Sequence, residues 1–162
     1  MELTSTSVER IREIREKQRV YFHSGATLDV HTRKANLKAF EKAVLKWEKP
    51  LCDALWADLH KSYEEAYLTE ISILLGEIRT HIRKIGKWTK PQRRCTPLKL
   101  FPSTSRIISE PLGTALIISP WNYPVQLLLT PLVGAISSGC TAVLKPSPYV
   151  PHVSKVIEDM IT

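Results

Sequence analysis

The stretch that decides the fold is residues 113–147, GTALIISPWNYPVQLLLTPLVGAISSGCTAVLKPS. Two short apolar runs, 114–118 and 141–144, flank a longer apolar segment that begins at Pro124 and is followed by Gly139. Short continuous apolar runs are typical of parallel strands covered on both faces. Proline in the first turn and glycine just past the last are common at the ends of helices. The stretch therefore predicts a strand–helix–strand unit with two parallel strands.

Each predicted strand is followed by a polar cluster, at residues 120–124 (PWNYP) and 145–147 (KPS). In an open parallel sheet, ligands bind beyond the carboxyl ends of the strands, so we expect the two clusters to form one site. The Asn122 amide could donate to an oxygen that gains charge in acyl chemistry, or simply cap its own loop. Lys145 could hold ribose hydroxyls or phosphate, or be solvated, and Trp121 could line the cleft or pack.

The composition indicates an ordinary globular domain. The chain has 162 residues, a net charge of +7 and 43% hydrophobic residues, which is enough for one domain with its own core. It contains no run of eighteen apolar residues and begins without the apolar core of a signal peptide, so neither a transmembrane segment nor secretion is expected. The three cysteines lack metal-binding spacing, which predicts free thiols in the cytoplasm and no metal site.

Positive charge is concentrated between residues 79 and 106, where nine Lys and Arg residues occur with no Asp or Glu. Such a stretch could bind nucleic acid or a membrane surface. The alternative is a solvated helix end followed by a linker. Only Trp88 and Phe101 are interleaved as aromatics and no nucleic-acid-binding motif is present, so the solvated linker is favoured.

The periodicity predicts three segments in an α/β fold. Residues 1–90 form an N-terminal helical layer, in which Ser62 caps a long helix whose apolar stripe runs from Leu68 to Ile85. Residues 91–112 form a connector with a short β segment, because Pro91, Pro97 and Pro102 interrupt any helix there. Residues 113–162 form the first, incomplete part of a Rossmann-like parallel sheet. No G-x-G-x-x-G or phosphate-loop motif is present at its first turn.

Several motifs together resemble the NAD(P)-dependent aldehyde dehydrogenases. They are EPLG at 110–113, PWNYP at 120–124, PLVGA at 131–135 and G-x-T-x-V-L-K-P-S at 139–147. The run ADLHK at 57–61, together with Glu70 and the Glu77–Ile78 dipeptide on the long helix, is similar to the class-3 branch of that family. The resemblance covers the N-terminal portion of such an enzyme only.

The resemblance implies a reaction and a set of roles. These enzymes oxidise an aldehyde to a carboxylic acid through a cysteine thiohemiacetal, hydride transfer to NAD or NADP, and hydrolysis of the thioester. It implies that Asn122 is an oxyanion donor and that Tyr123 lines the substrate tunnel. It also implies that Ser119, Trp121, Lys145 and Ser147 contribute to the binding of the coenzyme. A homodimer is implied for the complete enzyme.

Two departures from the family pattern matter. Pro148 stands where the family usually has a glutamate that binds ribose hydroxyls, so repulsion of the NADP 2′-phosphate should be reduced. The nucleophilic cysteine and the general-base glutamate of the family would lie beyond Thr162, so we expect this chain alone to be inactive. The alternatives are a non-catalytic nucleotide-binding or subunit-pairing fragment of the family and, more remotely, a basic nucleic-acid-binding module.

Overall fold

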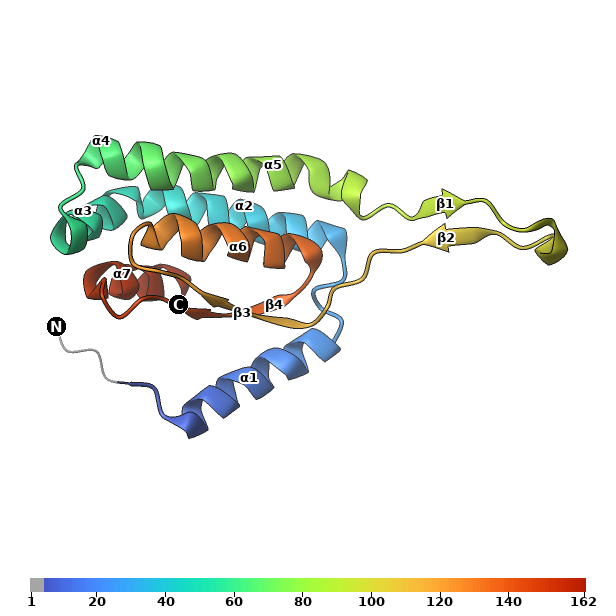
Figure 1. Ribbon diagram of the computed structural model, residues 1–162, viewed down its shortest axis with the longest axis horizontal. Coiled ribbons are helices and arrows are strands. Elements are labelled where there is room, and N and C mark those ends of the chain that lie inside the picture. Colours follow the sequence, from blue (N-terminus) through green and yellow to red (C-terminus); the bar gives the residue numbers. More distant parts are fainter. Residues whose placement is uncertain (1–4) are drawn as a thin grey trace.

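The computed structural model describes residues 5–162 and has the predicted α/β fold (Figure 1). The first four residues of the predicted helical layer lie outside the described part. The helices and strands, in chain order, are α1 (Val8–His23), α2 (Val30–Lys46), α3 (Glu48–Leu59), α4 (Tyr63–Ala66), the π-helical turn η1 (Tyr67–Ile71), α5 (Ser72–Trp88), β1 (Gln92–Arg94), the 3-10 turn η2 (Leu98–Leu100), β2 (Ser105–Ile107), β3 (Thr114–Ile118), α6 (Pro124–Ser138), β4 (Thr141–Lys145) and α7 (Pro151–Ile161).

The elements lie in layers. α2, α5 and α6 run side by side, β3 and β4 lie below them in Figure 1, and α1 lies below the strands. α3 packs against α7 at one end. A single apolar cluster extends through α2, α5 and α6, with Leu37, Ile78 and Leu128 fully buried. The N-terminal helices and the strand–helix–strand unit therefore share one core, which fixes the position of α6.

β3 and β4 pair in parallel, with Thr114 opposite Thr141 and Ile118 opposite Lys145. The predicted strand–helix–strand unit is confirmed, and helices lie on both sides of the sheet. The expectation that both strands are buried on both faces is wrong for β3, where Leu116 is 65% exposed. The described sheet has only these two strands, so β3 has a neighbour on one side and its outer side chains remain open to solvent.

The helix boundaries follow the local signals. The Ser62 hydroxyl accepts a hydrogen bond from the Glu65 amide, as the predicted cap requires. Pro124 occupies the first turn of α6, and Gly139 ends this helix in the left-handed conformation, with φ +89°. The long helix departs from expectation at its π-helical turn, where one extra residue rotates the inward face. Leu68 was predicted to be part of the buried stripe and is instead 65% exposed.

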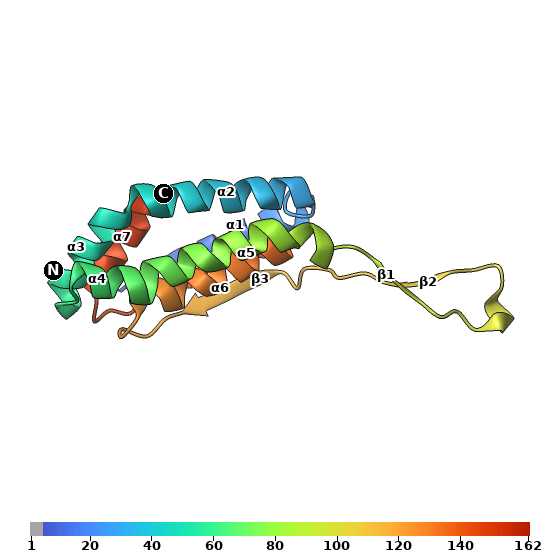
Figure 2. The same ribbon diagram turned by 90° about the horizontal axis from the view of Figure 1, so that it is seen from above.

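Residues 91–112 form an arm that projects away from the body in both views (Figures 1 and 2). β1 and β2 pair antiparallel along it, with Arg93 opposite Arg106. Large apolar side chains are exposed near its tip, including Leu98 and Phe101. Among the described helices, none combines the length and apolar character that crossing a membrane would need.

Candidate active site at the strand tips

The two polar clusters meet at the carboxyl edge of the parallel sheet. Ile118 and Lys145 are register partners, and the Ser119 amide donates to the Lys145 carbonyl at 3.2 Å. The loop 120–123 leaves this edge toward α6, and Pro146 leads away from it toward α7. The structure therefore brings together the two segments that carry all the predicted site residues.

The predicted coenzyme residues differ in exposure. The Lys145 side chain lies at the exposed end of β4, where its ammonium is available to a bound phosphate or ribose. Ser119 is buried, and its hydroxyl has no hydrogen-bond partner among residues 5–162. A buried hydroxyl without a partner is costly unless a ligand or water satisfies it. Ser147 is also buried, and its hydroxyl accepts from the Tyr149 amide at 3.3 Å.

The predicted chemical residues lie on the loop between β3 and α6. The side chains of Trp121, Asn122 and Tyr123 are all exposed at this edge. The main chain of this loop is held in place by Lys61, whose ammonium donates to the Asn122 carbonyl at 2.8 Å. The same ammonium lies 4.0 Å from the centre of the Tyr123 ring, a cation–π distance. Asn122 is thus exposed, while its backbone carbonyl is held by Lys61.

Lys61 also pairs with a fully buried carboxylate. Its ammonium lies 2.7 Å from Glu70 Oε1, and the exposed fractions of the two side chains are 9% and 0%. The other Glu70 oxygen accepts from the amides of Val125 at 2.8 Å and Gln126 at 3.2 Å. These amides belong to the first turn of α6, whose N-cap residue makes no side-chain cap bond. Glu70 therefore caps α6 from a different helix. Its negative charge lies at the positive end of the helix dipole, where it is stabilising.

The opposite end of α6 is held by a buried cation. The Arg33 guanidinium donates to the carbonyls of Ser137 at 3.0 Å and Leu28 at 2.9 Å. The Thr27 hydroxyl donates to the Gly139 carbonyl at 2.7 Å. Burial lowers the pKa of Arg33 from its ordinary value, but a guanidinium stays charged at neutral pH. α6 is therefore fixed at both ends by the helical layer.

None of the three cysteines lies at the strand tips. Cys52 is buried in α3, Cys95 is exposed on the arm, and Cys140 precedes β4 at the amino edge of the sheet. Burial raises the pKa of the Cys52 thiol to about 11, with smaller contributions from nearby carboxylates. A thiol with such a pKa is not an activated nucleophile at neutral pH. In residues 5–162, no group of three or more His, Cys, Asp or Glu residues could hold a metal ion.

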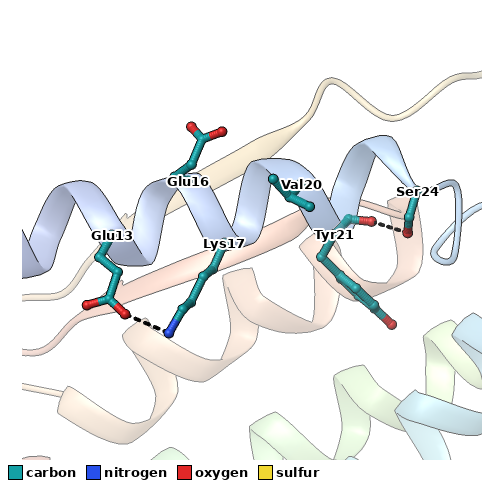
Figure 3. A pocket seen from close by; sticks show the side chains of 6 residues that line it. All are labelled: Glu13, Glu16, Lys17, Val20, Tyr21 and Ser24. Atoms are coloured by element: carbon teal, nitrogen blue, oxygen red, sulfur yellow. Dashed lines mark hydrogen bonds and ion pairs between the residues drawn. The ribbon is translucent and has the colours of Figure 1, made fainter.

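Several surface hollows adjoin α1 and the sheet. One is lined only by residues of α1 and its C-cap, including Lys17 and Tyr21, and Figure 3 shows these side chains along the helix. Glu13 and Lys17 form an exposed ion pair there, so this hollow is a helix surface. Another, of about 600 Å³, opens between β4 and α7 and reaches the strand tip at Pro146.

The family model that matches this chain is the aldehyde dehydrogenase family, over residues 1–162. The chain belongs to the aldehyde dehydrogenase family. It is 45% identical over 143 residues to 4,4'-diaponeurosporen-aldehyde dehydrogenase of Staphylococcus aureus, covering 88% of this chain and 31% of that protein. It is 37% identical to aldehyde dehydrogenase family 3 member F1 of Arabidopsis thaliana, covering 98% of this chain and 32% of the relative.

Solved structures of aldehyde dehydrogenases have the same fold as this chain. The substrate-bound state of Staphylococcus aureus AldH superposes with a TM-score of 0.89 at 41% identity, covering 96% of this chain and 33% of that one. Two structures below 25% identity share the fold and are described as complexes with NADP and with NAD+. The chain thus spans about a third of the length of the relatives it matches.

This aldehyde dehydrogenase segment contains a charged network that the sequence did not reveal. Lys61 and Glu70 both belong to the class-3-like pattern of the sequence, but neither is predicted to be a site residue. On a regular helix Glu70 would lie off the apolar stripe that includes Ile71 and Leu75, and the π-helical turn is what brings it inward. Its position next to Ile71, within the stretch that was expected to pack inward, is unusual for a carboxylate unless it is paired.

Proposed function

We propose that this chain supplies the oxyanion donor and part of the coenzyme site of an enzyme that oxidises an aldehyde to a carboxylic acid with NAD or NADP. The observation that carries the proposal is the register of the parallel strands, with Ile118 opposite Lys145. It puts the Asn122 loop and the Lys145 ammonium at one edge, where an α/β sheet binds its ligands. Residues 113–162 then serve as the opening part of the coenzyme domain.

The chemical role of Asn122 follows from its amide. When a thiolate adds to an aldehyde, the carbonyl oxygen gains negative charge. A fixed N–H donor near that oxygen stabilises the transition state more than the ground state, and one such donor contributes about 10²–10³ in rate. Asn122 is exposed at the strand tip on a loop whose backbone is held. Tyr123, next to it, lines the path of the aldehyde in this proposal.

The residues present fit a nicotinamide coenzyme. The Lys145 ammonium suits ribose hydroxyls or a phosphate. The buried Ser119 hydroxyl has no hydrogen-bond partner among residues 5–162, and a bound ligand could provide one. Trp121 and Ser147 flank these two on the same edge. The coenzyme, when bound, accepts the hydride of the oxidation. Pro148 is exposed after Ser147 and brings no carboxylate against a 2′-phosphate, so we propose that both NAD and NADP are accepted.

A chimera tests this function. Residues 1–162 replace the matching third of the Staphylococcus aureus relative, and aldehyde oxidation is followed through coenzyme reduction. We expect turnover that falls about 10²–10³-fold in kcat with Asn122→Ala, whereas Lys145→Ala raises the KM for coenzyme. The matched controls are Asn36→Ala and Lys38→Ala, both exposed on α2. A folded, active chimera that is insensitive to Asn122→Ala contradicts the assignment.

The alternative is a non-catalytic nucleotide-binding or subunit-pairing segment. Calorimetric titration of NAD and NADP separates the two, since coenzyme binding by a folded chimera without turnover favours the non-catalytic role. We also propose that residues 1–162 alone do not turn over aldehyde, that the complete enzyme is a cytoplasmic homodimer, and that the projecting arm contributes to pairing. The exposed apolar side chains of Leu98 and Phe101 on that arm support the pairing.

A further inference from the structure

A buried charge pair lies directly beneath the loop that carries Asn122. Lys61 comes from the turn after α3, and Glu70 comes from the π-helical turn between α4 and α5. The two side chains are nearly inaccessible to solvent. A buried ion pair is seldom retained for stability alone, because desolvating both charges costs about as much as their attraction returns. The position of this pair suggests a different role.

Both side chains of the pair contact the segment from Asn122 to Gln126. Lys61 binds the Asn122 carbonyl at 2.8 Å and lies against the Tyr123 ring, while Glu70 Oε2 accepts the amides at 2.8 and 3.2 Å that begin α6. The 2.7 Å contact between the Lys61 ammonium and Glu70 Oε1 connects the contacts made by Lys61 with those made by Glu70. The carbonyl end of the loop and the amide end of the helix are thus held by one unit.

The π-helical turn η1, which precedes α5, orients this carboxylate. In η1, the Ser72 amide bonds to the Tyr67 carbonyl, so the turn has one residue more than an α-helical turn. The extra residue turns Glu70 inward beside Ile71, and both side chains are fully buried. Single π-helical turns recur at functional sites in helices. Here the turn puts the carboxylate within reach of the α6 N-terminus.

We propose that Lys61 and Glu70 are positioning residues that fix the Asn122 loop for its role as oxyanion donor. The inference rests on the proposed function of Asn122 and adds to it the groups that set its geometry. An oxyanion donor must lie about 2.7–3.1 Å from the developing oxyanion. A displacement of about 1 Å can cost about 10²-fold in rate. With its own side chain exposed, Asn122 depends on its backbone for that placement, and Lys61 holds the backbone.

The decisive test is a double-mutant cycle on kcat in the chimera described above. Glu70→Gln keeps the shape of the side chain but removes its charge, and it should lower kcat at least about tenfold with a smaller change in the KM for coenzyme. In an Asn122→Ala background, the same substitution should cost less than about twofold, because the donor that it positions is already gone. A residue with only a structural role would give the same loss in both backgrounds.

The outcomes separate the two hypotheses. If Asn122→Ala leaves kcat unchanged, the proposed function is wrong. If Asn122→Ala impairs kcat but Glu70→Gln does not, or if the two effects multiply, the positioning role is wrong. Lys61→Met is a second variant with the same expectation. Lys49→Met breaks the exposed Lys49–Asp53 pair and serves as the control that should leave kcat unchanged.

A measurement on the unsubstituted 162-residue chain remains available if the variants fail to fold. First-turn amides of a helix ordinarily lack partners and exchange readily. The Val125 and Gln126 amides should instead exchange at least about tenfold more slowly than the Lys49 amide. Lys49 lies in the first turn of α3, whose N-cap also has no side-chain bond. Equal exchange at these positions would overturn the proposed geometry.

Discussion

Removing the charge of Lys61 should destabilise the protein far more than removing the charge of an exposed lysine. In Lys61→Met, the Glu70 carboxylate stays fully buried and keeps its two backbone donors, but it loses its counter-ion. Breaking a buried pair from one side costs about 3–5 kcal/mol. The free energy of unfolding of a domain is about 5–15 kcal/mol, so about a fifth or more of the stability should be lost.

A double variant that removes both charges distinguishes a charge effect from lost packing. Removing both charges in Lys61→Met/Glu70→Met leaves no buried ion, and the remaining penalty is the uncapped start of α6, about 1–2 kcal/mol. The double variant should therefore be more stable than Lys61→Met alone. Lys49→Met, at a pair whose side chains are 80% and 64% exposed, should cost no more than about 0.5 kcal/mol.

Urea unfolding followed by circular dichroism gives these free energies directly. High salt offers a further check, because it screens the Lys49 pair but leaves a pair without solvent contact almost unaffected. A loss below about 1 kcal/mol for Lys61→Met would refute the reasoning, as would a double variant that is weaker than both single variants. Either result would mean that the buried charges are not coupled.

Three further predictions concern separate parts of the chain. Gly139→Ala should cost about 1–3 kcal/mol in the free energy of unfolding, because φ is +89° and a Cβ there would meet the Thr27 carbonyl at 3.0 Å; Gly76→Ala, in open space on α5, should instead stabilise by about 0.5–1 kcal/mol. Iodoacetamide at pH 8 should alkylate exposed Cys95 and spare Cys52, since a pKa of about 11 leaves about one thiol in a thousand ionised; mass spectrometry would reveal early modification of Cys52 and so contradict this. Pro148→Glu in the chimera should raise the KM for NADP at least about tenfold relative to that for NAD through charge repulsion, and an unchanged ratio would show that this position does not face the 2′-phosphate.

The strand–helix–strand unit was predictable because its signals are local. Short apolar runs mark the two strands, and Pro124 and Gly139 mark the two ends of α6. Ser62 caps the long helix, as the neighbouring residues suggest. The alignment of the two strand tips follows from parallel pairing alone, which the register of Ile118 with Lys145 confirms. For these features, a window of a few residues contains the physical cause.

The charged network was not predictable in this way, because its partners are far apart in the sequence. Glu70 meets the α6 amides across 55 residues, and Arg33 reaches Ser137 across 104. A lone acidic or basic residue in a helix ordinarily indicates a solvated face. The π-helical turn also defeats a regular helical count, which is why Leu68 was expected inside and lies outside.

The clamping of α6 at both ends has a consequence for how this segment can be inherited or engineered. Glu70 and Arg33 approach opposite ends of the helix from two different helices, each with the sign that the dipole favours there. A recombination point placed between residues 90 and 113 would separate Glu70 and Arg33 from the two ends of α6 that they hold, wherever the other parent has different residues at these positions. Successful shuffling of the nucleotide half must therefore carry residues 27–70 along with it.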